Sequence, residues 1–115
     1  MLKILVIDDE ETVLDSISLV LKNAGYQVVK ARNGEEGIRI FDQYSFDIVI
    51  TDFFMPVCNG NQVAKYIRNN RKTTPVIGIT GTPEEADFSC FDIVLKKPFS
   101  LKKLIEHINI LKTSE

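Results

Sequence analysis

Short apolar runs alternate with amphipathic stretches along the chain, and this pattern predicts its elements. Five runs rich in Ile, Val and Leu have the length of buried strands. We predict strands over residues 3–7, 27–31, 46–51, 75–80 and 93–96. Uninterrupted apolar runs are typical of strands that are covered on both faces, as in a parallel sheet.

Between these runs, apolar residues recur every three or four positions, which predicts amphipathic helices. Gly25 supplies a left-handed stop after the first helix. Asn33 and Asn59 each stand three residues before a Glu or Gln, a capping-box arrangement that starts the second and third helices. Ser100 can cap the last helix. Strands that alternate with helices predict an α/β fold, with a parallel sheet and helices on both faces.

A length of 115 residues suffices for one domain with a real core, and we expect residues 1–115 to form one domain. The net charge of −2 argues against nucleic acid as a direct partner. The apolar runs are too short to span a bilayer, and Asp8 follows the N-terminus too closely for a secretory signal. Cys58 and Cys90 match no metal or redox spacing, which indicates reduced thiols in the cytoplasm.

Polar residues stand where four of the predicted strands end. They are Asp8 and Asp9, Asp52, Thr80 and Lys97. Ligands of open α/β sheets bind at the carboxyl ends of the strands, so these side chains lie where chemistry is expected. Two carboxylates about 4 Å apart repel each other by about 4 kcal/mol at an effective dielectric constant of about 20. A hard divalent cation such as Mg²⁺ offsets that repulsion, and carboxylate oxygens are among its usual ligands.

Other charged residues have simpler interpretations. Glu10 precedes the first helix and suits the positive end of its dipole. The cations Arg68, Arg71 and Lys72 lie near the end of the third helix, where they complement the negative end of the dipole. His107 falls on the last helix, far in sequence from the acids, and we expect it to be exposed and not catalytic.

Four short motifs, in this order, resemble the receiver domain of bacterial two-component response regulators. They are Asp8-Asp9 after the first strand, Asp52 followed by Met55-Pro56 and Gly60, Thr80 followed by Gly81, and Lys97-Pro98-Phe99. The resemblance covers nearly the whole chain. It implies a flavodoxin-like, doubly wound sheet of five parallel strands in the order 2-1-3-4-5.

The resemblance implies a role for each residue of the carboxylate group. Asp52 matches the phosphoacceptor, which takes a phosphoryl group from a phosphohistidine on a sensor histidine kinase or phosphotransfer protein. Asp9 matches the direct Mg²⁺ ligand, and Asp8 acts largely through water. The side chain of Asp52 and the backbone carbonyl of Phe54 complete the implied set of metal ligands.

A second group of residues is implied to hold the phosphoryl group. Lys97 matches the cation that pairs with the phosphoryl oxygens, and Thr80 matches the hydroxyl that bonds to them. Gly81 leaves room for the group, and Phe53 is the remaining phosphate-binding position. The resemblance also predicts a cis bond between Lys97 and Pro98.

The chain departs from the family at two places. Val94 stands where the family usually carries an aromatic residue, three positions before the active lysine. Only 17 positions separate this lysine from Thr80, where the family fits a complete fourth helix. The sequence at 82–85 is typical of a capped helix start, but only a turn or two can follow, so we predict a truncated or absent fourth helix. Phe88 and Phe91 are expected to cover the sheet face that the helix leaves open.

The leading hypothesis is a Mg²⁺-dependent phosphoacceptor switch that catalyses its own phosphorylation and dephosphorylation, not an enzyme with a separate substrate. Its downstream protein is unknown, and we expect a monomer or weak dimer. The alternative is a pseudo-receiver, an interaction module that keeps the fold without using phosphorylation. A flavin-binding protein is less favoured, because the acidic turn at residues 8–11 repels phosphate unless a metal intervenes.

Overall fold

The computed structural model describes residues 2–70, 73–85, 87 and 89–113 of the chain. Its elements are β1 (Lys3–Ile7), α1 (Glu11–Asn23), β2 (Gln27–Ala31), α2 (Gly34–Gln43), β3 (Ile48–Asp52), α3 (Gly60–Asn70), β4 (Val76–Thr80), the 3-10 turn η1 (Pro83–Glu85), β5 (Ile93–Lys96) and α4 (Leu101–Thr113). All five predicted strands are present, and their boundaries differ from the prediction by at most two residues.

All five strands are parallel and form one sheet in the order β2-β1-β3-β4-β5, which confirms the flavodoxin-like order. β3 and β4 are buried at every position, because each has a strand on both sides and is covered on both faces. This burial explains why their sequences are nearly continuous apolar runs. Asp52 is the last residue of β3, so the central strand itself carries this carboxylate.

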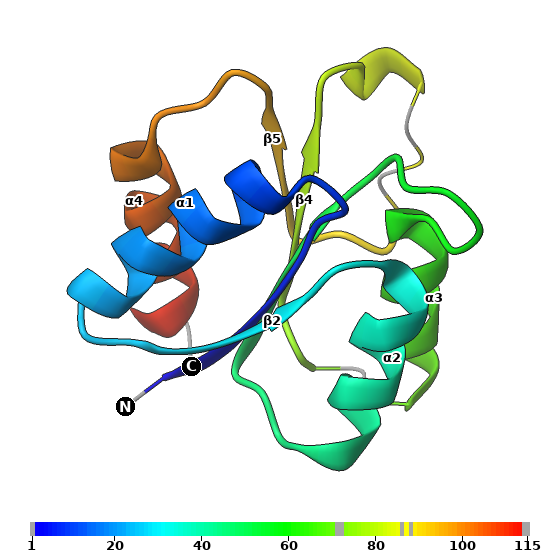
Figure 1. Ribbon diagram of the computed structural model, residues 1–115, viewed down its shortest axis with the longest axis horizontal. Helices are drawn as coiled ribbons and strands as arrows, with labels where there is room; N and C mark the ends of the chain where they lie inside the picture. The colour runs from blue at the N-terminus through cyan, green and yellow to red at the C-terminus, as the bar shows by residue number, and fades with distance from the viewer. Residues whose placement is uncertain (1, 71–72, 86, 88, 114–115) are drawn as a thin grey trace.

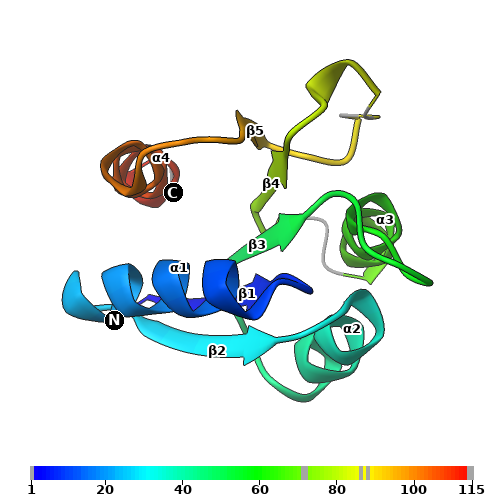
Figure 2. The same ribbon diagram turned by 45° about the horizontal axis from the view of Figure 1, so that its top comes forward.

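Helices cover both faces of the sheet (Figures 1 and 2). α1 and α4 lie on one face, and α2 and α3 lie on the other. Successive strand residues point to opposite faces and supply two separate cores. Ile4 packs in the core that includes Leu104 of α4, whereas Leu5 packs in the core that includes Ile67 of α3. Among the described residues, no helix is long and apolar enough to cross a bilayer.

The predicted caps hold the helix ends. Asn33 and Asn59 each accept a hydrogen bond from the backbone N–H three residues further on, at 2.8 and 2.9 Å. The Gln62 side chain completes the second capping box by accepting from the N–H of Asn59 at 2.8 Å. Ser100 caps α4 in the same way, at 3.0 Å. Gly25 has a φ of 95°, a left-handed conformation that favours glycine at the end of α1.

The prediction of a truncated or absent helix between β4 and β5 is confirmed for the described residues. Between β4 and β5, the helical structure of the described residues is the single three-residue turn η1. Phe91 takes over part of the covering role, because its ring lies so close to Gly78 of β4 that a Cβ atom there would stand 2.8 Å from it. The same ring packs on Phe53, with centroids 5.2 Å apart. Phe88, the other predicted cover, lies outside the described residues.

Two charged side chains differ from the expectation based on sequence. Arg68 does more than complement the dipole of α3. It donates to the carbonyl of Thr74 at 2.6 Å and pairs with Asp92, which ties α3 to the start of β5. The two other cations predicted beside it lie outside the described residues. His107 is half-buried rather than exposed, because it lines the space between α4 and β5.

Candidate functional site

Three carboxylates meet at the carboxyl edge of the sheet. Asp8 and Asp9 follow β1, and Asp52 ends the neighbouring strand β3. One oxygen from each lies within 4.8 Å of the other two. Asp8 and Asp52 are only 1% and 5% exposed, whereas Asp9 is exposed. The fold therefore brings the predicted acids together at a point where two of them are shielded from water.

Lys97 reaches this group from the loop after β5. Its Nζ lies 3.2 Å from Oδ1 of Asp52 and 3.8 Å from Oε1 of Glu10. Its backbone N–H donates to the carbonyl of Thr80 at 2.8 Å, which holds the loop against the end of β4. The bond between Lys97 and Pro98 is cis, as predicted. The lysine therefore extends from β5 across the end of β4 to the last residue of β3.

Burial and charge oppose each other in the pKa values of this group. Burial raises the pKa of Asp8 to about 6, against the effect of the hydrogen bond from the N–H of Glu10, and the charge of Asp52 adds to the rise. Burial also raises the pKa of Asp52, although Lys97 acts in the opposite direction. Burial alone would lower the pKa of Lys97, but the charge of Asp52, their hydrogen bond and the nearby acids raise it overall. Lys97 is therefore stabilised as a cation, and it lies beside carboxylates whose charged form is disfavoured by burial.

The predicted phosphate-binding residues border the same edge. Thr80 ends β4 and is buried, and its Oγ1 accepts a hydrogen bond from the N–H of Thr82 at 3.0 Å. Gly81 faces open space, since a Cβ atom there would meet no described atom within 4 Å. The N–H of Phe53 donates to the carbonyl of Ile79 at 2.8 Å, so in this structure it continues the bonding between β3 and β4.

The loop after β3 folds back onto the end of the strand. The N–H of Gly60 donates to the carbonyl of Phe53 at 2.8 Å, and a Cβ atom at Gly60 would stand 2.3 Å from the carbonyl oxygen of Asp52. Only glycine permits this close approach of two backbones. Phe54, within the same loop, is 48% exposed, and its ring packs on Phe53 with centroids 5.3 Å apart. The start of α3 is therefore fixed directly behind the central carboxylate.

The sequence did not reveal how two residues contribute to the site. Glu10 was expected to serve only the helix dipole, yet its N–H donates to Oδ1 of Asp8 at 2.8 Å and its carboxylate faces Lys97. Its place directly after the acidic pair was the available signal. Gly60 was part of the family motif, but spacing along the chain does not show which backbone it must approach.

The carboxylate group fits a hard divalent cation. Oδ2 of Asp8 is buried and has no hydrogen-bond partner among the described residues. A buried carboxylate oxygen without a partner is costly, and a bound cation satisfies it. The three converging ligand atoms come from Asp8, Asp9 and Asp52, and all are carboxylate oxygens, which suit Mg²⁺.

The fold and this edge define a class of α/β domain, one in which a sheet of order 2-1-3-4-5 carries acids, a lysine and a hydroxyl together at its carboxyl edge. Comparison with known families gives the class its name. The family model described as the response regulator receiver domain matches residues 4–109. The chain belongs to this family of two-component receiver domains, which act as phosphoacceptor switches.

Curated relatives agree with this assignment. The alkaline phosphatase synthesis transcriptional regulatory protein PhoP of Bacillus subtilis is 31% identical over 98% of this chain and 50% of its own length. The response regulator SaeR of Staphylococcus aureus is 30% identical over 98% of this chain and 51% of its own length. The chain therefore spans about half the length of these curated relatives.

Solved structures show the same fold. A receiver domain protein from Clostridium thermocellum has a TM-score of 0.90 and 34% identity, over 96% of this chain and 94% of that one. The response regulator protein TrrA from Thermotoga maritima, in complex with Mg²⁺ and BeF, has a TM-score of 0.90 and 32% identity, over 96% and 99% of the two chains. The likeness thus extends over nearly the whole domain.

Replacing Asp8 with Asn is expected to stabilise the chain at pH 7 in EDTA. Burial raises the pKa of Asp8 to about 6 in the folded chain, so binding of a proton by Asp8 stabilises the fold. This stabilisation is complete below about pH 4, near the pKa of an unfolded aspartate, and is lost as the pH rises through about 6. Asparagine is neutral throughout, and its Oδ1 can keep the bond from Glu10. We expect a gain of about 2–3 kcal/mol at pH 7 that disappears near pH 4, measured by urea unfolding.

The matched control for this experiment is Glu106→Gln, which removes an exposed carboxylate of α4 outside the cluster. Its free energy of unfolding should stay within about 0.5 kcal/mol of the parent. An Asp8→Asn protein that is no more stable than the parent at pH 7 would contradict the view that charge at this position opposes folding.

Proposed function

We propose that this chain is a Mg²⁺-dependent phosphoacceptor switch, which receives a phosphoryl group on Asp52 from a sensor histidine kinase or phosphotransfer protein. The observation that carries the proposal is the position of Asp52. Its carboxylate is nearly buried, lies beside two further carboxylates, and has the ammonium of Lys97 at 3.2 Å. In this proposal Asp52 is the nucleophile, Lys97 is the cation, and the carboxylates are the metal ligands around one point.

The chain's own residues have distinct parts in the proposed transfer. A carboxylate oxygen of Asp52 attacks phosphorus as the bond from phosphorus to the donor nitrogen breaks, which leaves an acyl phosphate on Asp52. Lys97, already beside that carboxylate, then pairs with a phosphoryl oxygen as a point charge. The hydroxyl of Thr80 donates a hydrogen bond to another phosphoryl oxygen. Open space at Gly81 leaves room for the phosphoryl group.

The Asp8, Asp9 and Asp52 side chains would hold Mg²⁺, with the backbone carbonyl of Phe54 as a proposed further ligand. When bound, the ion supplies positive charge that neutralises the approaching phosphoryl oxygens and offsets the repulsion among the acids. The unpartnered Oδ2 of Asp8 supports this assignment. The N–H of Phe53 is proposed to turn from Ile79 toward the phosphoryl group in the modified state.

The surroundings of the chain are proposed on the same basis. Receiver domains interact with histidine kinases or phosphotransfer proteins, and we propose such a donor in the cytoplasm. Residues 1–115 are proposed to act as one receiver domain, as a monomer or weak dimer. The transcriptional role in the relative's name belongs to that longer protein, and no direct nucleic-acid contact is proposed for this domain, whose net charge is −2.

Use of the fold as a pseudo-receiver is the rival function. Such a module has no need of a buried nucleophile or of a lysine held against it. Here every position of the phosphoacceptor motif is filled, and Asp52, Thr80 and Lys97 converge on one edge of the sheet. The complete set therefore favours phosphorylation over the rival.

Incubation with acetyl phosphate and Mg²⁺ is expected to add the mass of one phosphoryl group to the parent chain. Asp52→Asn should abolish the increment, because an amide is a poor nucleophile, and EDTA should abolish it for the parent. Intact-mass spectrometry measures both, with Glu106→Gln as the variant that keeps the increment. Phosphorylation of the Asp52→Asn protein would contradict the assignment of Asp52 as the phosphoacceptor.

Phe54 is expected to slow the loss of the phosphoryl group. Two residues past the nucleophile, its half-exposed ring can shade the line along which water attacks. In Phe54→Asn a polar side chain can instead orient that water, and hydrolysis should accelerate by roughly 3- to 10-fold, below the range of a full general base. The rate is measured by intact mass after removal of the donor.

Val57→Asn makes the same kind of polar change in the same loop and serves as the control. Val57 is 85% exposed and has a φ of 69°, a conformation that asparagine tolerates. Its hydrolysis rate should match that of the parent. A rate for Phe54→Asn that is unchanged or slower counts against the proposed shading.

The signal is expected to leave through residues 81–91 rather than by the family's usual route. Val94 offers no ring to follow Thr80, and the described residues between β4 and β5 form no full helix. Thr80 instead bonds to the N–H of Thr82, and Phe91 lies on β4 beside Phe53. Rearrangement of such a segment on phosphate binding is a known type of switch.

Hydrogen exchange with and without beryllofluoride and Mg²⁺ measures this expectation. Protection should change at the amides of residues 81–91 in the parent and stay constant in Asp52→Asn. A change confined to α4, with residues 81–91 silent, would show that the signal takes another path.

A further inference from the structure

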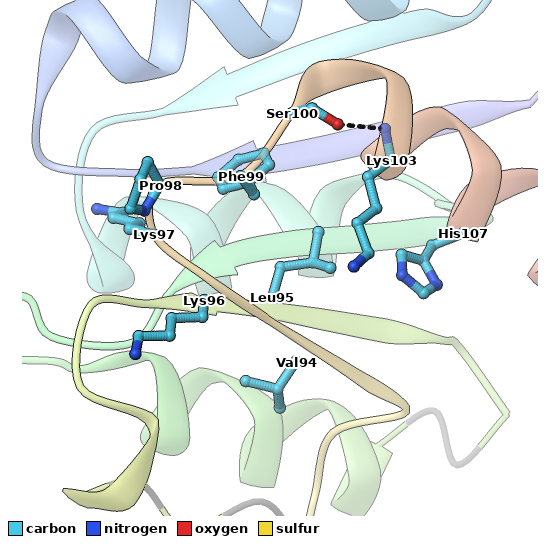
Figure 3. Close-up of a pocket in the computed structure, with 9 residues that line it drawn as sticks. All are labelled: Val94, Leu95, Lys96, Lys97, Pro98, Phe99, Ser100, Lys103 and His107. Atoms are coloured by element: carbon cyan, nitrogen blue, oxygen red, sulfur yellow. Dashed lines mark hydrogen bonds between the residues drawn. The ribbon is translucent and has the colours of Figure 1, made fainter.

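A groove of about 580 Å³ runs along the outer edge of β5 (Figure 3). β5, the loop at residues 97–100 and two side chains of α4 line it. Lys103 and His107 extend from α4 toward the strand, on the side where Leu95 lies. Val94 and Lys96 lie on the other side of the same strand. The groove therefore follows the strand edge and gives access to side chains on both of its faces.

β5 is an edge strand with one free side. Among the described residues β4 is its only hydrogen-bonded strand neighbour, and no full helix lies between β4 and β5. Lys97, directly after the strand, donates its N–H to the carbonyl of Thr80 at 2.8 Å, and Thr80 is the register partner of Lys96. Because successive residues of a strand direct their backbone groups to opposite edges, Ile93 and Leu95 face β4 as Lys97 does, and the backbone groups of Val94 and Lys96 face away from it. Such an edge is a template for an added strand.

The lining of the groove is basic and apolar. Of the nine described lining residues, Lys96, Lys97, Lys103 and His107 are basic in type and none is acidic. The whole chain carries a net charge of −2, so this concentration of basic groups is local. Leu95 is only 4% exposed, so its side chain forms part of the apolar floor. The chemistry complements a segment that carries carboxylates and small aliphatic side chains.

The geometry favours an extended segment over a helix. A helix bonds its own N–H and C=O groups internally and leaves those of Val94 and Lys96 without partners. An extended chain supplies main-chain donors and acceptors along the edge, while its side chains alternate between the two faces of β5.

A second copy of this chain fits the edge less well. Parallel pairing of two β5 strands in register sets Lys96 opposite Lys96, where like charges destabilise a sheet. Antiparallel pairing would need Asp92 to meet the lysines, but Asp92 already accepts from Arg68 and from the N–H of Val76. The short strand and its lysine are also features by which natural edges avoid pairing with themselves.

We propose that the β5 groove binds an extended, acidic segment of a partner protein, which adds to the sheet as a sixth strand. This deepens the proposed function by naming a kind of partner that this receiver binds, and it rests on that function only for its biological purpose. Main-chain bonds to Val94 and Lys96 hold the segment, and its carboxylates lie against the side chains of Lys96 and Lys103.

The test uses the full, unphosphorylated chain and a capped octapeptide of alternating Glu and Val. NMR should show shifts at the amides of Val94 and Lys96, and Lys103→Glu should weaken binding by about 5- to 10-fold. Lys102→Glu is the matched control, because Lys102 lies in the same turn of α4 but does not line the groove, and its affinity should equal that of the parent. An alternating Gln and Val peptide should bind about 5-fold more weakly or worse.

Equal affinities of the two lysine variants, or equal binding of the Gln peptide, would overturn the proposal. So would peptide binding that survives replacement of its backbone N–H groups by N-methyl groups, since strand addition requires them. Sedimentation that shows a stable dimer through β5 would assign the edge to a second copy instead. Because every arm uses unphosphorylated protein, failure here is distinct from failure of phosphorylation at Asp52.

Discussion

Repulsion among three carboxylates at one edge of the sheet is the constraint on which the rest of the structure depends. At 4.8 Å and an effective dielectric constant of about 20, two such charges repel by roughly 3.5 kcal/mol. That is a large share of the 5–15 kcal/mol or so that stabilises a typical domain. Asp8 and Asp52 stay together because two apolar cores hold β1 and β3 side by side. Lys97 relieves part of the repulsion, and the unpartnered oxygen of Asp8 marks where a cation relieves more.

The described residues between β4 and β5 form only the short turn η1, and the lack of a full helix there changes how the sheet is covered and where it is open. Phe91 lies on Gly78 and on Phe53, so a single ring seals part of β4 beside the phosphoacceptor strand. Arg68 holds the chain just before β5 through Asp92, which compensates for the support a helix would give. Neither contact covers the outer edge of β5. The same shortening that buries β4 with an aromatic ring therefore leaves β5 accessible to a partner.

Much of this structure was predictable, because its main features depend on local patterns. Continuous apolar runs gave the strands, capping boxes at Asn33 and Asn59 gave two helix starts, and the spacing from Thr80 to Lys97 excluded a full fourth helix. The features that could not be predicted from the sequence depend on contacts between distant segments. The pairing of Arg68 with Asp92 and the half-burial of His107 arise only when α3, β5 and α4 meet. The order of the strands came from the family resemblance, since periodicity does not encode it.

Lys97 links the two regions of the molecule that carry its chemistry. Its ammonium lies against Asp52, its backbone N–H bonds to Thr80, and the residue also lines the end of the β5 groove. Only one residue separates it from Leu95 in the chain. In the proposed mechanism the lysine leaves the carboxylate for a phosphoryl oxygen, and a shift of the residue alters the end of the groove directly. A receiver built in this way needs neither a full helix between β4 and β5 nor an aromatic residue at position 94 to connect its proposed phosphoryl site to a binding surface.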